Sequence, residues 1–400
     1  MLPQLWAGID AGKTHHHCVV IDDQGNRVFS QRVANDESDL LELIGAVAAL
    51  GDGGEVVWAV DLNHGGAALM IALFAAHDQH LLYIPGRTVH HASRTYRGDG
   101  KTDAKDAAVI ADQARMRRDL QPVRTGNDIS VDLRILTARR TDKVCDRTRA
   151  INRLRAQLLE YFPALEQVFD YSRSKAGLLL LTRYQTPDVL RRLGQKRLHS
   201  WLRNQGVRSS ADVAGRAMAA AKSQYISVPA QRIGAPMVAE IAQEILGLQG
   251  QINALDTQIA ERFREHHQAE IILSMPGFGP LLSAEFLGAT GDDLTVFESV
   301  NRLAGAGLAP APKDSGRIKG NHHRPRRYDR RLLRACYMAA MSSLKSSTAS
   351  RTYYDRKRAE GKTHTQSVLS LARRRLNVLW AMLRDGITYE PQPVPSVRAA

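Results

Sequence analysis

Residues 4–10 read QLWAGID, and residues 55–61 read EVVWAVD. Each stretch is a short apolar run that ends at an aspartate, and such runs predict strands buried in a sheet. Three more segments with strand patterns and three with helical spacing lie around them. These are the strands 16–21, 27–33 and 80–84 and the helices 36–50, 65–76 and 103–118, with a basic, glycine-containing loop predicted over 87–101.

The order of these elements predicts the fold of the first part of the chain. Three consecutive strands are followed by a helix, a strand, a helix, a strand and a last helix. This β-β-β-α-β-α-β-α order is that of the α/β ribonuclease-H-like fold, in which the first and fourth strands are neighbours. We therefore expect residues 1–124 to form a ribonuclease-H-like domain.

The rest of the chain is predicted to be mainly helical. Apolar residues recur mostly at spacings of three, four and seven over residues 129–162 and again over 237–263, which favours two coiled-coil-like arms. Residues 163–236, between the arms, predict shorter helices. The expected division is therefore a domain 1–124, a helical coiled-coil region 125–269, a helical domain 270–387 and a proline-rich, disordered tail 388–400.

The charge of the chain is distributed unevenly. Its 400 residues include 55 Lys and Arg against 41 Asp and Glu, which gives a net charge of +14. Residues 1–124 hold 12 basic and 16 acidic residues, whereas residues 125–400 hold 43 and 25. An acidic first part can collect carboxylates for a metal, and a basic remainder favours a polyanionic partner such as nucleic acid. A protein of high isoelectric point without such a partner is the alternative.

Membrane spans, secretion signals and cysteine motifs are not expected in this sequence. No run of about 18 apolar residues exists, so no membrane span is predicted. The first residues lack the pattern of a signal peptide. Cys18, Cys145 and Cys336 are far apart and form no CxxC motif, which argues against a disulfide framework and a zinc module. We expect a reduced, cytoplasmic protein associated with the nucleoid.

Four aspartates stand where a sheet of this order would bring them together. Asp10 and Asp61 end the first and fourth strands, and Asp103 and Asp106 share one face at the start of the last helix. Clustered like charges repel one another unless a cation neutralises them, and oxygen ligands suit Mg²⁺. We predict that these four aspartates hold a catalytic metal. The alternative is two turn residues and two acids favoured by the helix dipole.

A second candidate region begins with residues 271–291, which read IILSMPGFGPLLSAEFLGATG. A helix end, the sequence Pro-Gly-Phe-Gly and another helix form a helix-hairpin-helix pattern. Gly277 and Gly279 would let the backbone approach a phosphate beside the free N–H groups of the second helix. A plain turn between two helices is the alternative.

The dipeptide Ser315-Gly316 stands within the most basic segment of the chain. Residues 302–358 contain 15 Lys and Arg and three acids. A serine in such a loop is placed to meet a phosphodiester, although Ser-Gly alone is also a turn dipeptide. His322 and His323 are interpreted as part of a solvated basic loop. The cations predicted to contact nucleic acid are Arg317, Lys319, Arg324, Arg326 and Arg327.

Five segments, taken in order, resemble one family. They are GIDAGK at 8–13, VVWAVD at 56–61, GKTDAKDA at 100–107, SMPGFGPLLSAEFL at 274–287 and the loop around Ser315-Gly316. The sequence resembles the DEDD insertion-sequence transposases, the insertion-sequence-110 family, and their Piv-type invertase relatives. The resemblance covers roughly residues 4–124 and 270–345.

The resemblance implies a function and a set of roles. It implies a RuvC-like first domain with Mg²⁺, or Mn²⁺ as the alternative ion, held by Asp10, Asp61, Asp103 and Asp106. It also implies that Ser315 attacks DNA and forms a covalent phosphoserine. The partners would be donor DNA, target DNA and a structured bridge RNA, bound by a dimer that assembles to a tetramer. The family usually has glutamate where this chain has Asp61, which shortens that side chain by one methylene.

Two other functions compete with an RNA-guided recombinase. A hydrolytic RuvC-like junction nuclease would use water in place of Ser315. A nucleic-acid-binding protein without catalytic activity would use the carboxylates only structurally. A phosphoserine adduct on cleaved DNA distinguishes the first alternative, and metal-dependent cleavage eliminates the second.

Overall fold

A computed structural model of the chain forms two compact units, Met1–Gly126 and Asn127–Ala400. It describes residues 4–62, 65–96, 100, 102–123, 128–291, 294–297, 299–305, 307–317, 320, 322–323, 325 and 328–391. No helix in these described ranges is long and apolar enough to cross a membrane. The four-part division predicted from the sequence stays a prediction.

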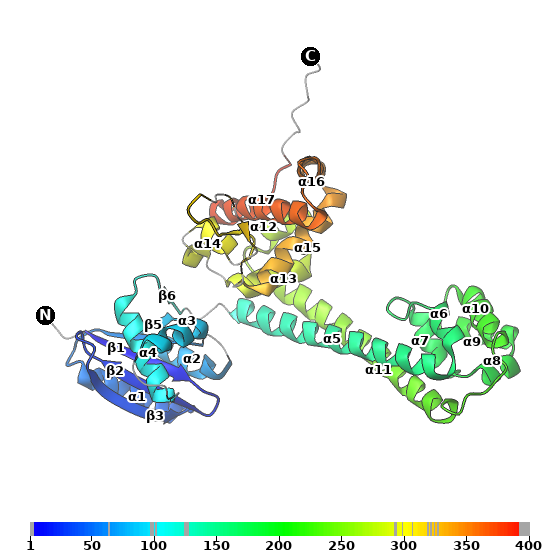
Figure 1. Cartoon of the computed structure of the whole chain (residues 1–400), viewed down its shortest axis with the longest axis horizontal. Helices are drawn as coiled ribbons and strands as arrows, with labels where there is room; N and C mark the ends of the chain where they lie inside the picture. The colour runs from blue at the N-terminus through cyan, green and yellow to red at the C-terminus, as the bar shows by residue number, and fades with distance from the viewer. Residues whose placement is uncertain are drawn as a thin grey trace, which may run out of the picture. The chain divides into compact units, whose positions relative to one another are not determined.

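The first unit contains a mixed six-stranded sheet (Figure 1). Strand β1 at its centre is antiparallel to β2 and parallel to β4, with Ile9 opposite Val60. The sheet order is β3-β2-β1-β4-β5-β6, in agreement with the predicted neighbours. The strands are β1 (Leu5–Ala11), β2 (His15–Ile21), β3 (Arg27–Ala34), β4 (Val56–Val60), β5 (His80–Tyr83) and a short β6 (Gln121–Pro122).

Helices cover both faces of this sheet. Helices α1 (Glu37–Leu50) and α2 (Ala68–Ala76) pack on one face, around Trp58 and Phe74. Helix α4 (Asp103–Met116) packs on the other face with α3 (Gly86–Ala92) beside it. Short 3₁₀ turns at Gly65–Ala67 and Ser93–Thr95 complete the unit.

The loop predicted over 87–101 is wrong in its first half, because helix α3 occupies Gly86–Ala92. The basic and glycine-containing composition of this segment is typical of a loop, so composition alone did not indicate a helix. Val89 is only 4 % exposed and packs with the core under α4, so tertiary burial supports a helix that local composition does not indicate.

Helix α4 lies directly on strand β1 because Gly8 has no side chain. A Cβ atom at Gly8 would be 2.2 Å from the Ala107 carbonyl oxygen and 2.3 Å from the Ala111 nitrogen. Ala107 and Ala111 are four residues apart and share one helix face with Asp103. The close approach of α4 to β1 therefore determines the position of the first turn of α4 relative to the sheet.

The second unit is mainly helical and is organised around two long antiparallel helices. Helices α5 (Asp128–Tyr161) and α11 (Gln231–Arg264) pack along each other, and Arg153 pairs with Glu244 at 2.9 Å across them. Both helices were predicted, but α11 begins six residues before the predicted start. The helix continues through Pro236, a residue type that usually stands at a helix start. Proline removes one backbone N–H donor, and burial of neighbouring Val238 offsets that loss. A coiled-coil geometry stays a prediction.

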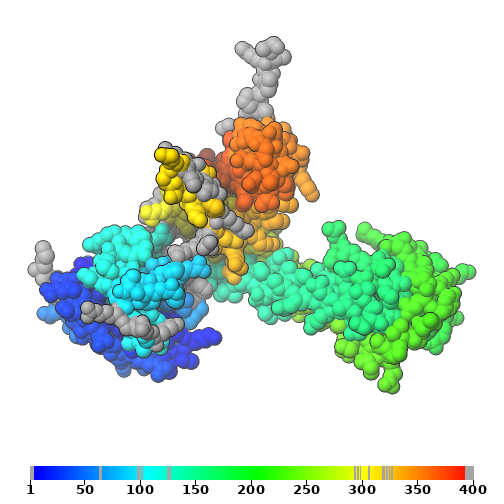
Figure 2. Space-filling model, in the orientation of Figure 1, coloured from blue at the N-terminus to red at the C-terminus, as the bar shows by residue number. Residues whose placement is uncertain are grey.

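Each end of the long helix pair carries its own apolar core. At one end Leu154 and Ile245 contribute to a core with five short helices, and at the other Leu133 and Phe263 contribute to a core with the C-terminal helices. Figure 2 shows the first bundle as a separate mass on the paired helices. Its helices are α6 (Pro163–Val168), α7 (Lys175–Leu181), α8 (Pro187–Leu193), α9 (Gln195–Asn204) and α10 (Ser210–Lys222).

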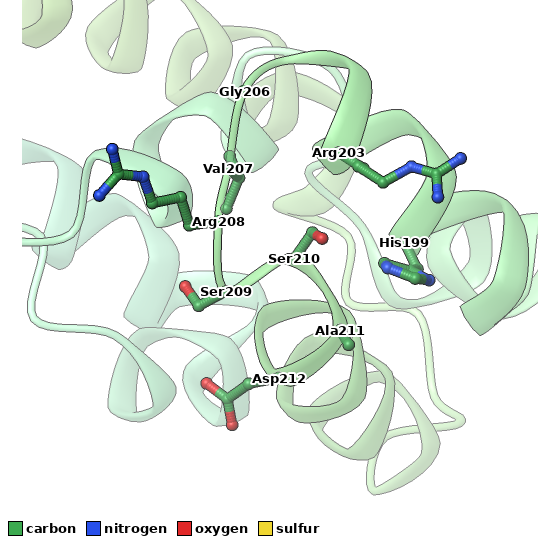
Figure 3. Close-up of a pocket in the computed structure, with 9 residues that line it drawn as sticks. All are labelled: His199, Arg203, Gly206, Val207, Arg208, Ser209, Ser210, Ala211 and Asp212. Carbon is green, nitrogen blue, oxygen red and sulfur yellow. The ribbon is translucent and has the colours of Figure 1, made fainter.

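The C-terminal bundle contains two helices joined by the Pro-Gly-Phe-Gly turn, and the helix-hairpin-helix interpretation of this segment stays a prediction. The elements of the bundle are α12 (Ala269–Ser274), α13 (Pro280–Thr290), a 3₁₀ turn (Leu294–Phe297), α14 (Val300–Gly305), β7 (Ala311–Pro312), β8 (His322–His323), α15 (Arg330–Ser346), α16 (Thr348–Ala359) and α17 (His364–Asp385). The tail predicted over 388–400 lies mostly outside the described residues, and 388–391 form neither helix nor strand. The turn between α9 and α10 in the other bundle is drawn in Figure 3.

Candidate active site

The side-chain alternation of β1 and β4 places two aspartates on the face covered by α4. Asp10 follows Trp6 and Gly8 at every second position, and Asp61 follows Val57 and Ala59. Because Ile9 is opposite Val60 in the parallel pair, Asp10 and Asp61 stand at neighbouring strand ends. Asp61 Oδ1 also accepts a hydrogen bond of 3.2 Å from the backbone N–H of Ala11.

The first turn of α4 supplies the other two aspartates. Thr102 caps this helix, since its hydroxyl oxygen accepts a hydrogen bond of 3.2 Å from the Lys105 N–H. Asp106 lines the same hollow as Asp10 and Asp61. Asp103 does not line this hollow, but it acts on His17: burial lowers the pKa of His17, and the Asp103 carboxylate opposes that shift.

The hollow that contains these carboxylates has a volume of about 430 Å³. Burial raises the pKa of Asp61, and the charge of Asp106 raises it further. Three carboxylates at one hollow thus carry an electrostatic penalty that a cation would relieve. Three basic residues also line this hollow. Two of them lie in the segment 87–101, which the sequence predicts to bind nucleic acid as a basic loop, but none was singled out individually as a site residue. The three residues are His90, Arg94 and Lys105.

The donor set of the hollow fits a hard divalent cation. Its acidic ligands are all oxygen, as Mg²⁺ prefers, and they come from elements fixed by strand register and by the Gly8 contact. Within the described ranges, however, no three His, Cys, Asp or Glu side chains are close enough to form a ready-made metal cluster. A metal site made of all four aspartates therefore stays a prediction.

The two glycines of the helical hairpin have different surroundings. Gly277 has a φ of +87°, and a Cβ atom there would be 2.2 Å from the carbonyl oxygen of Ala339 on α15. This glycine is required by packing. Gly279 is the N-cap of α13, and a Cβ atom there would meet nothing within 4 Å. Space for a ligand thus exists beside Gly279, and the predicted role of both glycines in binding nucleic acid stays a prediction.

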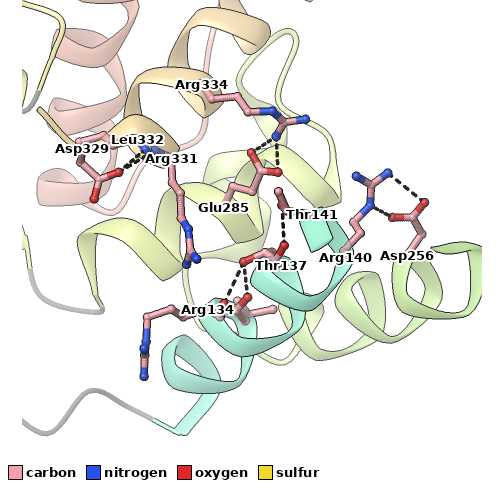
Figure 4. A network of polar contacts seen from close by, with 11 residues as sticks. Arg134, Thr137, Arg140, Thr141, Asp256, Glu285, Asp329, Arg331, Leu332 and Arg334 are labelled. Atoms are coloured by element: carbon pink, nitrogen blue, oxygen red, sulfur yellow. Dashed lines mark hydrogen bonds and ion pairs between the residues drawn. The ribbon is translucent and has the colours of Figure 1, made fainter. Parts of the chain in front are cut away.

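Two charged contacts hold the hairpin in the C-terminal bundle. Arg375 on α17 is 6 % exposed and donates to the Ser350 hydroxyl and to the Pro276 carbonyl, and burial lowers its pKa to about 10. Glu285 on α13 is buried and pairs with Arg334 on α15 (Figure 4). Neither contact could be predicted from sequence patterns, because each joins residues far apart in the chain.

Ser315 is exposed on the connection between β7 and β8. Gly316 follows it with a φ of +56°, a conformation that favours glycine, and Arg317 is exposed next in the chain. The nucleophilic role of Ser315 and the phosphate-binding role of Arg317 stay predictions. The other predicted cations of this segment lie outside the described residues: Lys319, Arg324, Arg326 and Arg327.

Comparisons with known proteins match both ends of the chain. A family model described as a transposase matches residues 7–163, and one described as "Transposase IS116/IS110/IS902 family" matches residues 269–355. The chain is 62% identical to the "Insertion element IS900 uncharacterized 42 kDa protein" of Mycobacterium paratuberculosis over 98% of both chains. It is 49% identical to an IS116 protein of Streptomyces clavuligerus over 98% of this chain and 97% of that one. It is 28% identical to the "Mini-circle putative transposase for IS117" of Streptomyces coelicolor over 97% and 96%.

Proposed function

The chain belongs to the IS116/IS110/IS902 family of insertion-element transposases, and from this premise we propose that it is an RNA-guided DNA recombinase with Ser315 as its nucleophile. It would cut donor and target strands, exchange them and rejoin them through a covalent serine–DNA link. The observation that carries this proposal is the hollow shared by Asp10, Asp61 and Asp106.

The proposed catalytic unit is a ribonuclease-H-like, RuvC-like domain. The sheet order β3-β2-β1-β4-β5 and the position of α4 over β1 support it. Asp10, Asp61, Asp103 and Asp106 would hold Mg²⁺, which when bound polarises a scissile phosphate. His90, Arg94 and Lys105 line the same hollow as three of these acids. Their side chains would bind and orient the negatively charged DNA backbone beside the carboxylates.

Ser315 would store the energy of the broken bond. Its Oγ forms a bond to phosphorus while the bond from phosphorus to a deoxyribose oxygen breaks; the serine proton is lost and the leaving oxygen gains one. Attack by another strand's hydroxyl reverses the step and rejoins DNA. The exposure of Ser315 and the glycine after it support access to so large a substrate. Arg317 and Lys319 would neutralise charge that develops on the phosphate.

The partners in this proposal are DNA, a structured guide RNA and further copies of the chain. The net charge of the basic remainder supports binding to nucleic acid. The serine and the carboxylates must reach one phosphodiester, and we propose that a dimer, assembled to a tetramer on two DNAs, brings them there.

The proposal is tested by strand exchange between donor and target plasmids, with the RNA that co-purifies with the protein identified by sequencing. Ser315→Ala should keep nucleic-acid binding and lose strand exchange and the covalent adduct. Ser346→Ala, an exposed serine at the end of α15, is the matched control and should retain both. If Ser315→Ala cuts DNA and leaves a free phosphate end, the hydrolytic nuclease is the correct function. If no RNA co-purifies with the protein, the proposal that a guide RNA directs the reaction is wrong.

A further inference from the structure

A hollow of about 610 Å³ lies at the turn between α9 and α10, in the bundle of short helices. The residues that line it are His199, Arg203 and the continuous segment 206–212. Its titratable or charged side chains are those of His199, Arg203, Arg208 and Asp212. No Phe, Tyr or Trp lines it. A lining of this kind suits an anion and offers no aromatic surface on which a base could stack.

Ser210 is a buried polar group of this hollow without a protein partner. It is the first residue of α10 and is 4 % exposed. Its hydroxyl makes no hydrogen bond with the described part of the chain. Figure 3 shows the hydroxyl turned toward His199 and Arg203. The hydroxyl therefore opens into the hollow, where an oxygen of a ligand can accept its hydrogen bond.

The start of helix α10 adds donors at the same place. The helix has 13 residues, and its N-cap, Ser209, makes no side-chain hydrogen bond to the first turn. The first N–H groups of a helix have no partner within the helix and carry a partial positive charge. Together with the Ser210 hydroxyl they form a set of donors suited to phosphate oxygens.

The arginines of the hollow are not neutralised by the protein. Arg203 and Arg208 form no ion pair with the described residues and flank the turn on opposite sides in Figure 3. The one acid of the hollow, Asp212, pairs with Arg216 at 2.9 Å and turns away from Arg203.

The surrounding bundle has the same excess of positive charge. Residues 163–236 contain twelve Lys and Arg and four Asp and Glu. Every one of these four acids pairs with an arginine: Glu166 with Arg155, Asp170 with Arg173, Asp188 with Arg191 and Asp212 with Arg216. The remaining cations are available to an external anion.

We propose that the α9–α10 hollow binds the phosphate backbone of the nucleic acid on which this transposase acts. Ser210, the start of α10 and Arg203 would bind one phosphate, and Arg208, on the other side of the turn, would bind a neighbouring phosphate. The contact is to phosphate rather than to bases, so it positions nucleic acid independently of its sequence. The inference rests on the proposed action on nucleic acid but not on the serine chemistry. The bundle α6–α10 at one end of the long helix pair would thus hold the nucleic acid in place.

The test is binding of the full-length protein, in EDTA so that no cleavage occurs, to a labelled DNA duplex and to a labelled RNA hairpin. The variant Arg203→Gln/Arg208→Gln is compared with Arg192→Gln/Lys196→Gln, which removes two exposed charges from the same bundle outside the hollow. The first double variant should bind about tenfold more weakly and lower the slope of log affinity against log salt by about 1 to 2. The control should stay within about twofold.

A third variant tests the buried hydroxyl. Ser210→Ala should bind about threefold more weakly with an unchanged Tm, because the hydroxyl pairs with no protein group. A lower Tm with unchanged binding would make its role structural and contradict the proposal.

Each combination of results has a defined meaning. Weakening with DNA alone, or with RNA alone, assigns the phosphate to that nucleic acid. Unchanged affinity of the Arg203→Gln/Arg208→Gln variant for both probes overturns the inference and leaves the proposed function standing. Failure of the unaltered protein to bind either probe overturns the proposed function itself.

Discussion

The carboxylate hollow and the Ser315 loop differ in how the fold determines them. Asp10 and Asp61 are positioned by strand register, and Asp106 by a helix pressed against Gly8. Ser315 is exposed on a short connection and is positioned by a glycine turn. A site built by packing can be tested by changing its supports, whereas an exposed nucleophile can only be tested by its chemistry.

The largest expected effect comes from the carboxylates themselves. Asp10→Asn or Asp61→Asn should lower strand exchange by roughly 10³-fold or more, because each removes a charged oxygen ligand but keeps the side-chain shape. Asp61→Glu, which restores the length usual in the family, should keep appreciable activity. Asp23→Asn, in an exposed turn, is the control and should leave exchange unchanged. Normal exchange in either Asn variant would remove that residue from the site.

The next effect concerns the support of the hollow. Gly8→Ala should destabilise the first unit by about 3 kcal/mol, because its Cβ would overlap the backbone of α4. Hydrogen exchange read by mass spectrometry should increase in peptides of β1 and α4. Gly45→Ala, on α1 with open space around it, should instead stabilise the protein by about 0.5–1 kcal/mol. Equal protection in the Gly8 variant would show that α4 does not depend on this contact.

The hairpin glycines should differ by a smaller amount. Gly277→Ala should cost about 2 kcal/mol, since the residue has a positive φ and contacts the backbone of α15. Gly279→Ala should change stability by less than about 0.5 kcal/mol. Thermal unfolding measures both. If the Gly279 variant also binds DNA more weakly, the predicted approach of the backbone to a phosphate at this turn is supported. Equal losses of stability in the two variants would contradict the tight packing at Gly277 and the open space at Gly279.

The smallest expected effect is on stability against pH. Burial raises the pKa of Asp61 above its ordinary value of 3.8, so its folded-state contribution is most favourable below that value and is lost as pH rises through the raised pKa. Without divalent metal, Asp61→Asn should therefore raise Tm at pH 7, and the difference from the unaltered protein should shrink as pH approaches 3.8. A lower Tm of the variant at pH 7 would show that ionised Asp61 stabilises the fold.

Strand patterns and order were sufficient to predict five of the six strands and the neighbouring positions of Asp10 and Asp61, but not the two-residue strand β6. The helix at Gly86–Ala92 was not predictable, because burial of Val89 rather than local composition supports it. The contact of Gly8 with α4 and the hydroxyl of Ser210 were also missed, since each depends on residues brought together only by packing. Ser315 was selected by its basic surroundings and by a family resemblance.

The most direct test of the account is the site of covalent attachment. The protein would be incubated with Mg²⁺, its co-purified RNA and a nicked DNA duplex that traps the cleaved strand, and the linked peptide identified by mass spectrometry. We predict a nucleotide attached to Ser315 Oγ in the unaltered protein and no adduct in Ser315→Ala or Asp61→Asn. Attachment at another residue, or cleavage without any adduct, would contradict the account.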